Sequence, residues 1–234
     1  MLQVATILLC SASFHVSTMA DMYACPVTSK INLSPATASA LNPKLIIKDH
    51  RNKFADQGVT FFDKGQYEQA AGMFDRAIAQ DQAKPTLYYD RGLARLYAGK
   101  LRDSAADFSM AINLKSDFGL AYLNRGIVEG QLGNQDRAFL NFNRAIELLP
   151  NSDLGYLNRG ILFALRHEND SALQDFNKVI ERNPKNAQAF SYRGNLYREI
   201  GNVDAAIANF RRAVELDPTD EQSRHFLQLL SVSL

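Results

Sequence analysis

One spacing constrains this chain more than any other feature: three kinds of residue recur every 34 residues, five times over, without an insertion. The first column consists of Gly58, Gly92, Gly126, Gly160 and Gly194. The second column consists of Phe74, Phe108, Phe142, Phe176 and Phe210. The third column is small or β-branched and consists of Ala77, Ala111, Ala145, Val179 and Ala213. A fixed period of this length is typical of proteins that stack one supersecondary unit on the next. We therefore expect five units, at residues 51–84, 85–118, 119–152, 153–186 and 187–220.

Each unit has the sequence pattern of two helices joined by a turn. In the third unit, residues 122–132 and 138–148 carry apolar residues at helical spacing. Gly133-Asn134 between them is a turn signal, and Pro150 cannot continue the second helix. A glycine inside a helix costs about 1 kcal/mol relative to alanine, so its recurrence predicts a close approach between the two helices. Because one hairpin cannot bury both of its faces, neighbouring hairpins must stack into a continuous core.

These columns resemble the signature of the tetratricopeptide repeat family, in which an aromatic residue, a glycine, an alanine, a phenylalanine and a closing proline hold fixed places. The resemblance covers residues 51–220, with Tyr or Phe in place of the family's tryptophan and, in four units, arginine in place of the leucine before the glycine. It implies an all-α fold, a right-handed superhelical solenoid of five hairpins. It also implies that function lies on a concave face formed by the first helix of each unit.

The resemblance indicates which side chains face that groove, and in the middle units most of them are apolar. They are Tyr89, Leu93, Leu96, Leu120, Leu123, Asn124, Ile127, Leu154, Leu157, Asn158 and Ile161. We expect an exposed groove for an apolar or amphipathic peptide segment, with the asparagines bonding to an extended backbone. The alternative is that the apolar members pack between neighbouring first helices. Some family members hold a peptide's carboxyl terminus with Lys, Asn and Arg. We do not expect this clamp, because Ala55, Val59 and Asp90 stand at the corresponding positions.

The arginine before the repeat glycine is matched by a polar residue before the core phenylalanine. The arginines are Arg91, Arg125, Arg159 and Arg193, and the matching residues are Asp107, Asn141, Asp175 and Asn209. We expect these to be structural pairs, with the arginine stem covering core carbon. The alternative is that the arginines project from the surface and bind carboxylates of a ligand.

The segments outside the repeats have a different composition. Residues 221–234 read as an amphipathic helix, which we expect to cap the last hairpin. Residues 1–20 contain an apolar run and small residues at the end, which favours a cleaved signal peptide and an exported, periplasmic or secreted protein. The absence of Lys and Arg from this segment counts against an export signal. The alternative is a disordered tail on a cytoplasmic protein. We interpret residues 21–50 as a linker or N-terminal extension, which either forms a helix leading into the first unit or occupies the groove.

Composition and motifs argue against several classes of function. The net charge is +1 and the two signs balance over residues 51–220, so the footprint of a nucleic-acid-binding protein is missing. No apolar run after residue 30 is long enough for an integral membrane span. The four histidines are dispersed, and no phosphate-binding or nucleophile motif occurs, so we expect no metal, no cofactor and no enzymatic activity.

We therefore expect a protein–protein interaction scaffold or adaptor whose partner is another protein or peptide. One alternative is an accessory subunit that presents clients to an enzyme. Another is a self-associating structural module, which would be a homo-oligomer.

Overall fold

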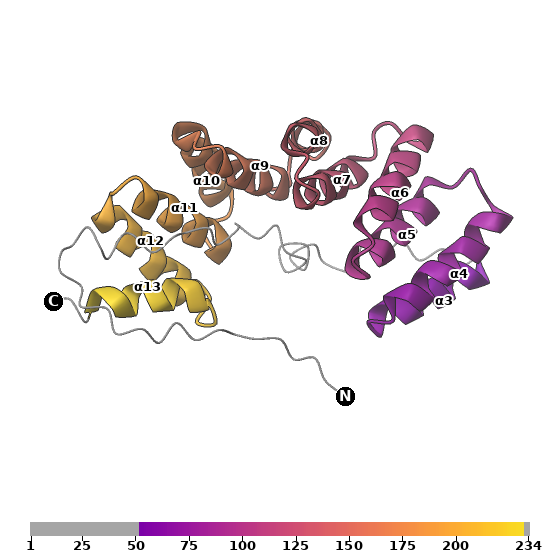
Figure 1. Ribbon diagram of the computed structural model, residues 1–234, viewed down its shortest axis with the longest axis horizontal. Coiled ribbons are helices and arrows are strands. Elements are labelled where there is room, and N and C mark those ends of the chain that lie inside the picture. The colour runs from indigo at the N-terminus through magenta and orange to yellow at the C-terminus, as the bar shows by residue number, and fades with distance from the viewer. Residues whose placement is uncertain (1–51, 232–234) are drawn as a thin grey trace. The chain divides into compact units, whose positions relative to one another are not determined.

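Five helical hairpins and one further helix form the part of the chain that the computed structural model describes, residues 52–231 (Figure 1). The first helices of the hairpins are α3 (Lys53–Asp63), α5 (Pro85–Tyr97), α7 (Gly119–Gln131), α9 (Leu154–Leu165) and α11 (Ala187–Glu199). The second helices are α4 (Tyr67–Gln80), α6 (Leu101–Leu114), α8 (Gln135–Leu148), α10 (Asn169–Arg182) and α12 (Val203–Leu216). The last helix is α13 (Glu221–Ser231). Residues 52–231 contain no strand, and the all-α repeat fold expected from the 34-residue period is confirmed.

Two predictions concern segments outside the described residues. The signal peptide at residues 1–20 and the linker or extension at residues 21–50 stay predictions. Over residues 52–231, no helix has both the length and the apolar character needed to cross a membrane.

The turn inside each hairpin uses backbone that few residues adopt. Gly65, Gly99, Gly133 and Gly201 have φ between 72° and 81°, in the left-handed region that glycine enters without a steric penalty. His167 takes the same place in the fourth unit with φ 58°. A residue with a β-carbon is disfavoured in the left-handed region, so the backbone of His167 carries a local conformational cost.

The recurrent glycine marks the closest contact inside each hairpin, as predicted. A β-carbon added at Gly126 would lie 2.6 Å from Cε1 of Phe142, and the corresponding contacts in the other four units lie between 2.7 and 3.0 Å. The phenylalanine column is buried in all five units, at 1% exposure or less. Helix pairs in each hairpin therefore meet where the first helix has no side chain.

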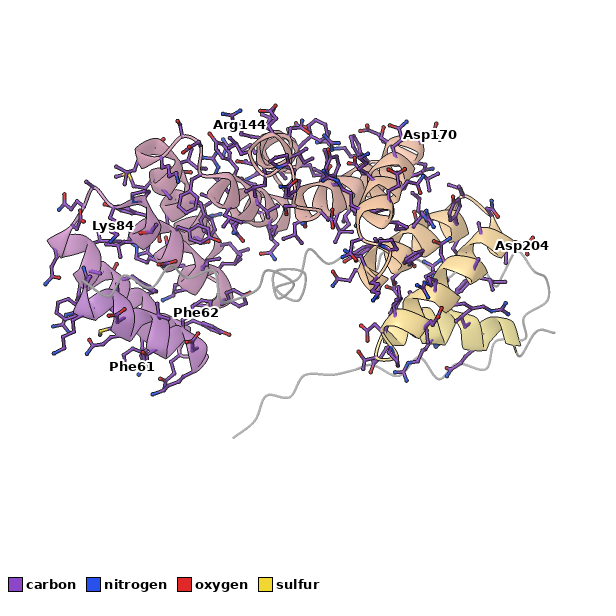
Figure 2. The ribbon with its side chains drawn as sticks, turned by 180° about the vertical axis from the view of Figure 1, so that it is seen from behind. Phe61, Phe62, Lys84, Arg144, Asp170 and Asp204 are labelled. Atoms are coloured by element: carbon purple, nitrogen blue, oxygen red, sulfur yellow. The ribbon has the colours of Figure 1, made fainter. Side chains whose placement is uncertain are left out.

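Neighbouring hairpins share one core. Each second helix packs against the first helix of the next unit, and successive first helices from α5 to α11 also contact each other. Between the first two units, Phe62, Tyr67 and Tyr97 form an aromatic cluster whose ring centroids lie 5.2 to 5.3 Å apart. Phe62 is buried, whereas its neighbour Phe61 is only partly buried (Figure 2).

The second helices carry charged side chains on the side away from the first helices. Arg144 on α8, Asp170 on α10 and Asp204 on α12 are exposed and project outward in the same way (Figure 2). Charged side chains that water can solvate therefore cover the second-helix side of the stack.

Helix α13 packs on the last hairpin. The Phe226 ring lies 4.7 Å, between centroids, from the core ring of Phe210, and Phe226 is only 8% exposed. Ser223 is fully buried, and its Oγ lies 3.1 Å from Oγ of Ser191 on α11. Asp220 accepts a hydrogen bond from the backbone N–H of Ser223, 3.1 Å away, which caps the start of the helix. The helix covers an apolar flank that would otherwise face water.

Candidate protein-interaction sites

The side chains expected to line an exposed apolar groove are mostly buried. Nine of the eleven are 7% exposed or less: Tyr89, Leu93, Leu96, Leu123, Asn124, Ile127, Leu157, Asn158 and Ile161. Leu120 and Leu154 are half-buried and pack against the core. The expected exposure is therefore wrong for these nine residues.

Packing between neighbouring units explains this burial. Leu123 and Ile127 on α7 share one cluster with Phe142 on α8 and with Leu162 on α9. The alternative interpretation, that the apolar residues fill the space between neighbouring first helices, accounts for them. The helical period places these residues on the correct face of α7, but it carries no information about how closely α9 approaches that face.

One column within this region is polar and incompletely bonded. Asp90, Asn124 and Asn158 occupy the same place in three successive units, and each is 3% exposed or less. In each residue, Oδ1 is buried and has no hydrogen-bond partner. Asn124 and Asn158 belong to the predicted groove residues, whereas the sequence indicates Asp90 only as a residue that argues against the clamp.

The amide nitrogens of the two asparagines are already used. Asn124 Nδ2 donates to the backbone oxygen of Leu120 at 2.9 Å and to the hydroxyl of Tyr89 at 3.1 Å. Asn158 Nδ2 donates to the backbone oxygen of Leu154 at 2.8 Å. These bonds set the orientation of both amides, so the group left over in each is an acceptor.

Burial also changes the titration of this column. The pKa of Asp90 is raised well above its usual value because burial penalises the carboxylate, and the positive charge of Lys84 offsets only part of that effect. The pKa of Tyr89 is likewise raised by burial and by the neighbouring Asp90. Both groups are buried, and an unmet acceptor in a buried site is costly.

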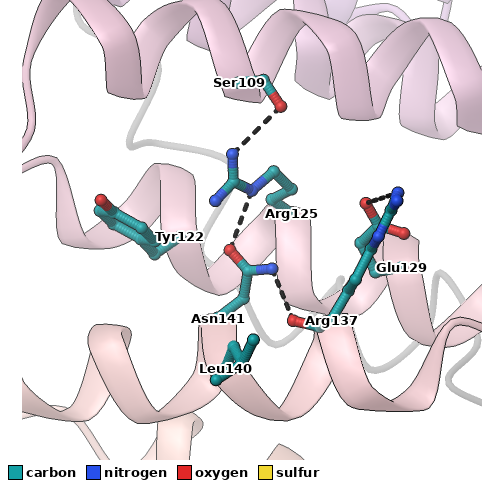
Figure 3. Close-up of a pocket in the computed structure, with 7 residues that line it drawn as sticks. All are labelled: Ser109, Tyr122, Arg125, Glu129, Arg137, Leu140 and Asn141. Carbon is teal, nitrogen blue, oxygen red and sulfur yellow. Dashed lines mark hydrogen bonds and ion pairs between the residues drawn. The ribbon is translucent and has the colours of Figure 1, made fainter.

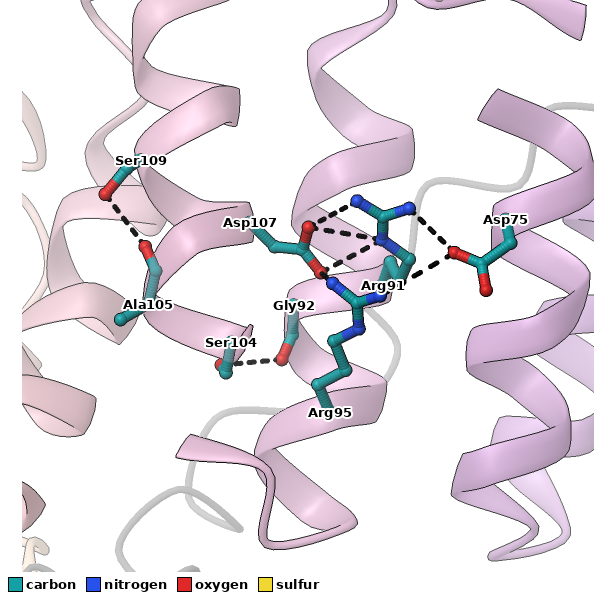
Figure 4. A network of polar contacts seen from close by, with 8 residues as sticks. All are labelled: Asp75, Arg91, Gly92, Arg95, Ser104, Ala105, Asp107 and Ser109. Atoms are coloured by element: carbon teal, nitrogen blue, oxygen red, sulfur yellow. Dashed lines mark hydrogen bonds and ion pairs between the residues drawn. The ribbon is translucent and has the colours of Figure 1, made fainter. Parts of the chain in front are cut away.

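A second polar system joins each arginine to two second helices. Arg91 donates from Nε and Nη2 to Asp107 on α6, and from Nη1 to Asp75 on α4 at 2.7 Å (Figure 4). Arg95 adds a second cation, with Nη1 2.8 Å from Asp107 Oδ2. Arg159 binds Asp175 through Nε and Nη2, both at 2.8 Å. The structural pairs predicted for Arg91 and Arg159 are confirmed.

The partner from the preceding unit was not anticipated. It lies 16 residues before each arginine, directly after the core phenylalanine, and the four are Asp75, Ser109, Asn143 and Asn177. The sequence signal is a polar residue at this place in every one of these units. The sequence alone does not show that this polar residue bonds to the arginine of the next unit, because that contact depends on how the units stack.

Arg125 and Arg193 differ from the other two arginines in having neutral partners. Arg125 donates from Nε to Asn141 Oδ1 at 2.9 Å and from Nη1 to Ser109 Oγ at 3.1 Å (Figure 3). Burial lowers the pKa of Arg125 and of Arg193. For Arg91, the hydrogen bonds and charges of Asp107 and Asp75 outweigh burial and raise the pKa, and the bond to Asp175 raises that of Arg159.

A cavity of about 350 Å³ opens beside Arg125 (Figure 3). Ser109 on α6, Tyr122 and Glu129 on α7, and Arg137, Leu140 and Asn141 on α8 complete its walls. Leu140 is 67% exposed, the highest value among the large hydrophobic side chains recorded as exposed in residues 52–231. The cavity thus combines a half-buried cation with an apolar rim.

Comparison with known proteins agrees with the repeat pattern. A family model described as tetratricopeptide repeat matches residues 89–153 and 157–221, and a model described as TPR repeat matches residues 58–96. No curated protein matches the chain.

Several solved structures share the fold at low sequence identity. YrrB, described as a TPR protein with an unusual peptide-binding site, is 21% identical with a TM-score of 0.62, covering 84% of this chain and 100% of its own. MamA from Desulfovibrio magneticus is 14% identical with a TM-score of 0.66, covering 75% and 99%. A tetratricopeptide repeat protein from Parabacteroides merdae is 22% identical with a TM-score of 0.66, covering 76% and 72%. With the two family models spanning more than half of its length, the chain belongs to the tetratricopeptide repeat family.

Proposed function

We propose that this chain is a non-enzymatic scaffold that binds an extended segment of another protein along its first helices. Asp90, Asn124 and Asn158 supply hydrogen-bond acceptors for the backbone N–H groups of that segment. Tetratricopeptide repeats are generally interaction modules without catalytic groups, and YrrB offers a precedent for a peptide ligand on this fold.

The observation that carries the proposal is the repetition of one unmet acceptor at a 34-residue interval. Leaving a buried acceptor unpaired costs about 1–3 kcal/mol, and native proteins keep few of them. An apolar side chain in the same place would avoid this cost. An extended peptide presents N–H groups at regular intervals, which suits a column of acceptors repeated on successive first helices.

Burial of the column sets a condition on access. Each acceptor is covered in the free protein, so the side chains over it must shift when a segment binds. Leu120 and Leu154 lie one helical turn before Asn124 and Asn158 and are only half-buried, which suits them to move and then to contact the ligand.

Replacement of Asn158 by Leu separates binding from stability. We expect Asn158→Leu to unfold at the same or a higher urea concentration than the wild type, because it removes an unmet acceptor. We expect peptides selected on the wild-type protein from a library of random extended segments to bind it roughly tenfold more weakly or worse, measured by fluorescence anisotropy.

Asn195→Leu is the matched control. Asn195 donates to the backbone oxygen of Ser191 at 3.1 Å, the same bond to its own helix, but it lies outside the column. Selected peptides should bind this variant as they bind the wild type. Equal binding to Asn158→Leu, or a selection that yields no peptide, would contradict the proposal.

A further inference from the structure

The four arginines of the repeat provide an internal comparison of what surrounds a half-buried guanidinium. Arg91 lies within 2.8 Å of carboxylate oxygens of both Asp107 and Asp75. Arg159 lies 2.8 Å from a carboxylate oxygen of Asp175. At the same place in the third unit, the carboxylate is replaced by the amide of Asn141 and the second partner is Ser109. Arg125 therefore meets partners at the same two places but lacks the anion.

The guanidinium of Arg125 retains bonding capacity on its open side. Nε and Nη1 are engaged, whereas no hydrogen bond joins Nη2 to any residue within 52–231. The ring of Tyr122, 5.4 Å from the guanidinium carbon, supports the group from one face. Burial lowers the pKa of Arg125, and the nearby Tyr122 and Glu129 offset only part of this effect.

The other charges at the cavity leave it positive. Glu129 accepts a hydrogen bond from Asn134 at 2.7 Å and lies 3.8 Å from Arg137, so its single negative charge is shared with a second cation. Two arginines and one glutamate therefore line the cavity of about 350 Å³. Such a site favours one more negative charge.

We propose that this cavity, between α6 and α8 and over α7, binds the carboxylate of a Glu or Asp side chain on a partner protein. The carboxylate accepts from Arg125 Nη2, next to the bonds that Asn141 and Ser109 already make with this guanidinium, and an apolar residue beside it in the partner covers Leu140. The exposed rim at Leu140 favours a protein side chain over a free anion, because an anion alone leaves this apolar surface in water. The cavity combines side chains of α7 with those of α6 and α8, and none of its lining residues belongs to the acceptor column Asp90, Asn124 and Asn158.

The test uses the side-chain Nε–Hε signal of Arg125 in ¹⁵N-labelled protein. The probe is the capped dipeptide acetyl-Leu-Glu-amide, compared at equal ionic strength with acetyl-Leu-Gln-amide and with sodium acetate. We expect a saturable shift of the Arg125 signal with the glutamate peptide, little shift with the glutamine peptide, and a roughly tenfold weaker response to acetate. The Arg159 signal, already paired with Asp175, should not move.

The matched variant is Asn141→Asp, which supplies the missing carboxylate from the chain itself. Aspartate stands at this place in the second and fourth units, so the variant should fold and should melt at the wild-type temperature or above. We expect its affinity for acetyl-Leu-Glu-amide to fall roughly tenfold or more.

Three outcomes would overturn the proposal. One is a glutamate peptide that leaves the Arg125 signal unmoved. Another is an Asn141→Asp variant that binds this peptide as the wild type does. The third is a response to acetate as strong as the response to the peptide, which would assign the cavity to a free anion instead of a partner's side chain.

Discussion

At the scale of single residues, the most consequential difference between neighbouring units is the charge at one buried position. Asp90 occupies the place that Asn124 and Asn158 hold in the next two units, and burial raises the pKa of Asp90 well above its usual value of 3.8. The folded protein therefore holds this proton at pH values where the unfolded chain has released it. The contribution of Asp90 to the free energy of unfolding is most favourable below about pH 4 and falls as the pH rises toward the folded-state pKa of Asp90.

Asp90→Asn removes this penalty while keeping the shape of the side chain. We expect the variant to be more stable than the wild type at pH 8 by about 1–3 kcal/mol, with the difference shrinking toward pH 4. Urea unfolding at pH 4, 6 and 8 measures it, and the exposed Asp103→Asn serves as control. A variant less stable than the wild type at pH 8 would show that the carboxylate of Asp90 is stabilising.

The residue scale also shows what the sequence could and could not predict. The pairing of Arg159 with Asp175 follows from the covariation of two columns within one chain, because both residues belong to the same hairpin. The bond from Arg159 to Asn143 crosses between units, and the burial of Ile127 depends on the approach of α9. Both are properties of the stack, and a periodic pattern describes only the unit.

At the scale of elements, α13 differs from the other helices of residues 52–231 because none of them pairs with it in a hairpin. Its contribution is the burial of Phe226 against Phe210 and of Ser223 against Ser191. Burying one aromatic side chain contributes about 1.5–3 kcal/mol, and each kcal/mol corresponds to about 2–4 °C for a domain of this size.

Truncation before Glu221 should therefore lower the melting temperature by about 3–12 °C and reduce solubility, because the flank of the last hairpin becomes exposed. Differential scanning calorimetry measures the shift. Truncation after Ser231 is the control and should leave the melting temperature unchanged. A protein without α13 that melts like the wild type and stays soluble would mean that the helix does not act as a cap.

At the scale of the whole molecule, stability depends on contacts between neighbouring units, as expected for a solenoid. Ile127, in the third of five units, is fully buried where α7 meets α8 and α9. A carboxylate there would be unpaired in an apolar cluster, which disrupts the contact between the units on either side.

We expect Ile127→Glu to lower the melting temperature and to split unfolding into two transitions, one for the repeats before the substitution and one for those after it. Circular dichroism and calorimetry on the same preparation test this. Leu140→Glu is the matched control, because Leu140 belongs to the same unit and is 67% exposed. A single transition of Ile127→Glu at the wild-type temperature would contradict the burial of this residue.

The arginine that bonds across the boundary between units has a consequence for how such chains are duplicated or recombined. A unit moved to a new place carries its arginine and the hydrogen-bond partner 16 positions later. The second hydrogen-bond partner of the arginine comes from whichever unit precedes it. A tandem copy of the third unit would place Asn143, in place of Ser109, in front of the second Arg125. One hydrogen-bond partner of the arginine at each junction is thus inherited from the upstream neighbour, and the order of the units is part of what the chain encodes.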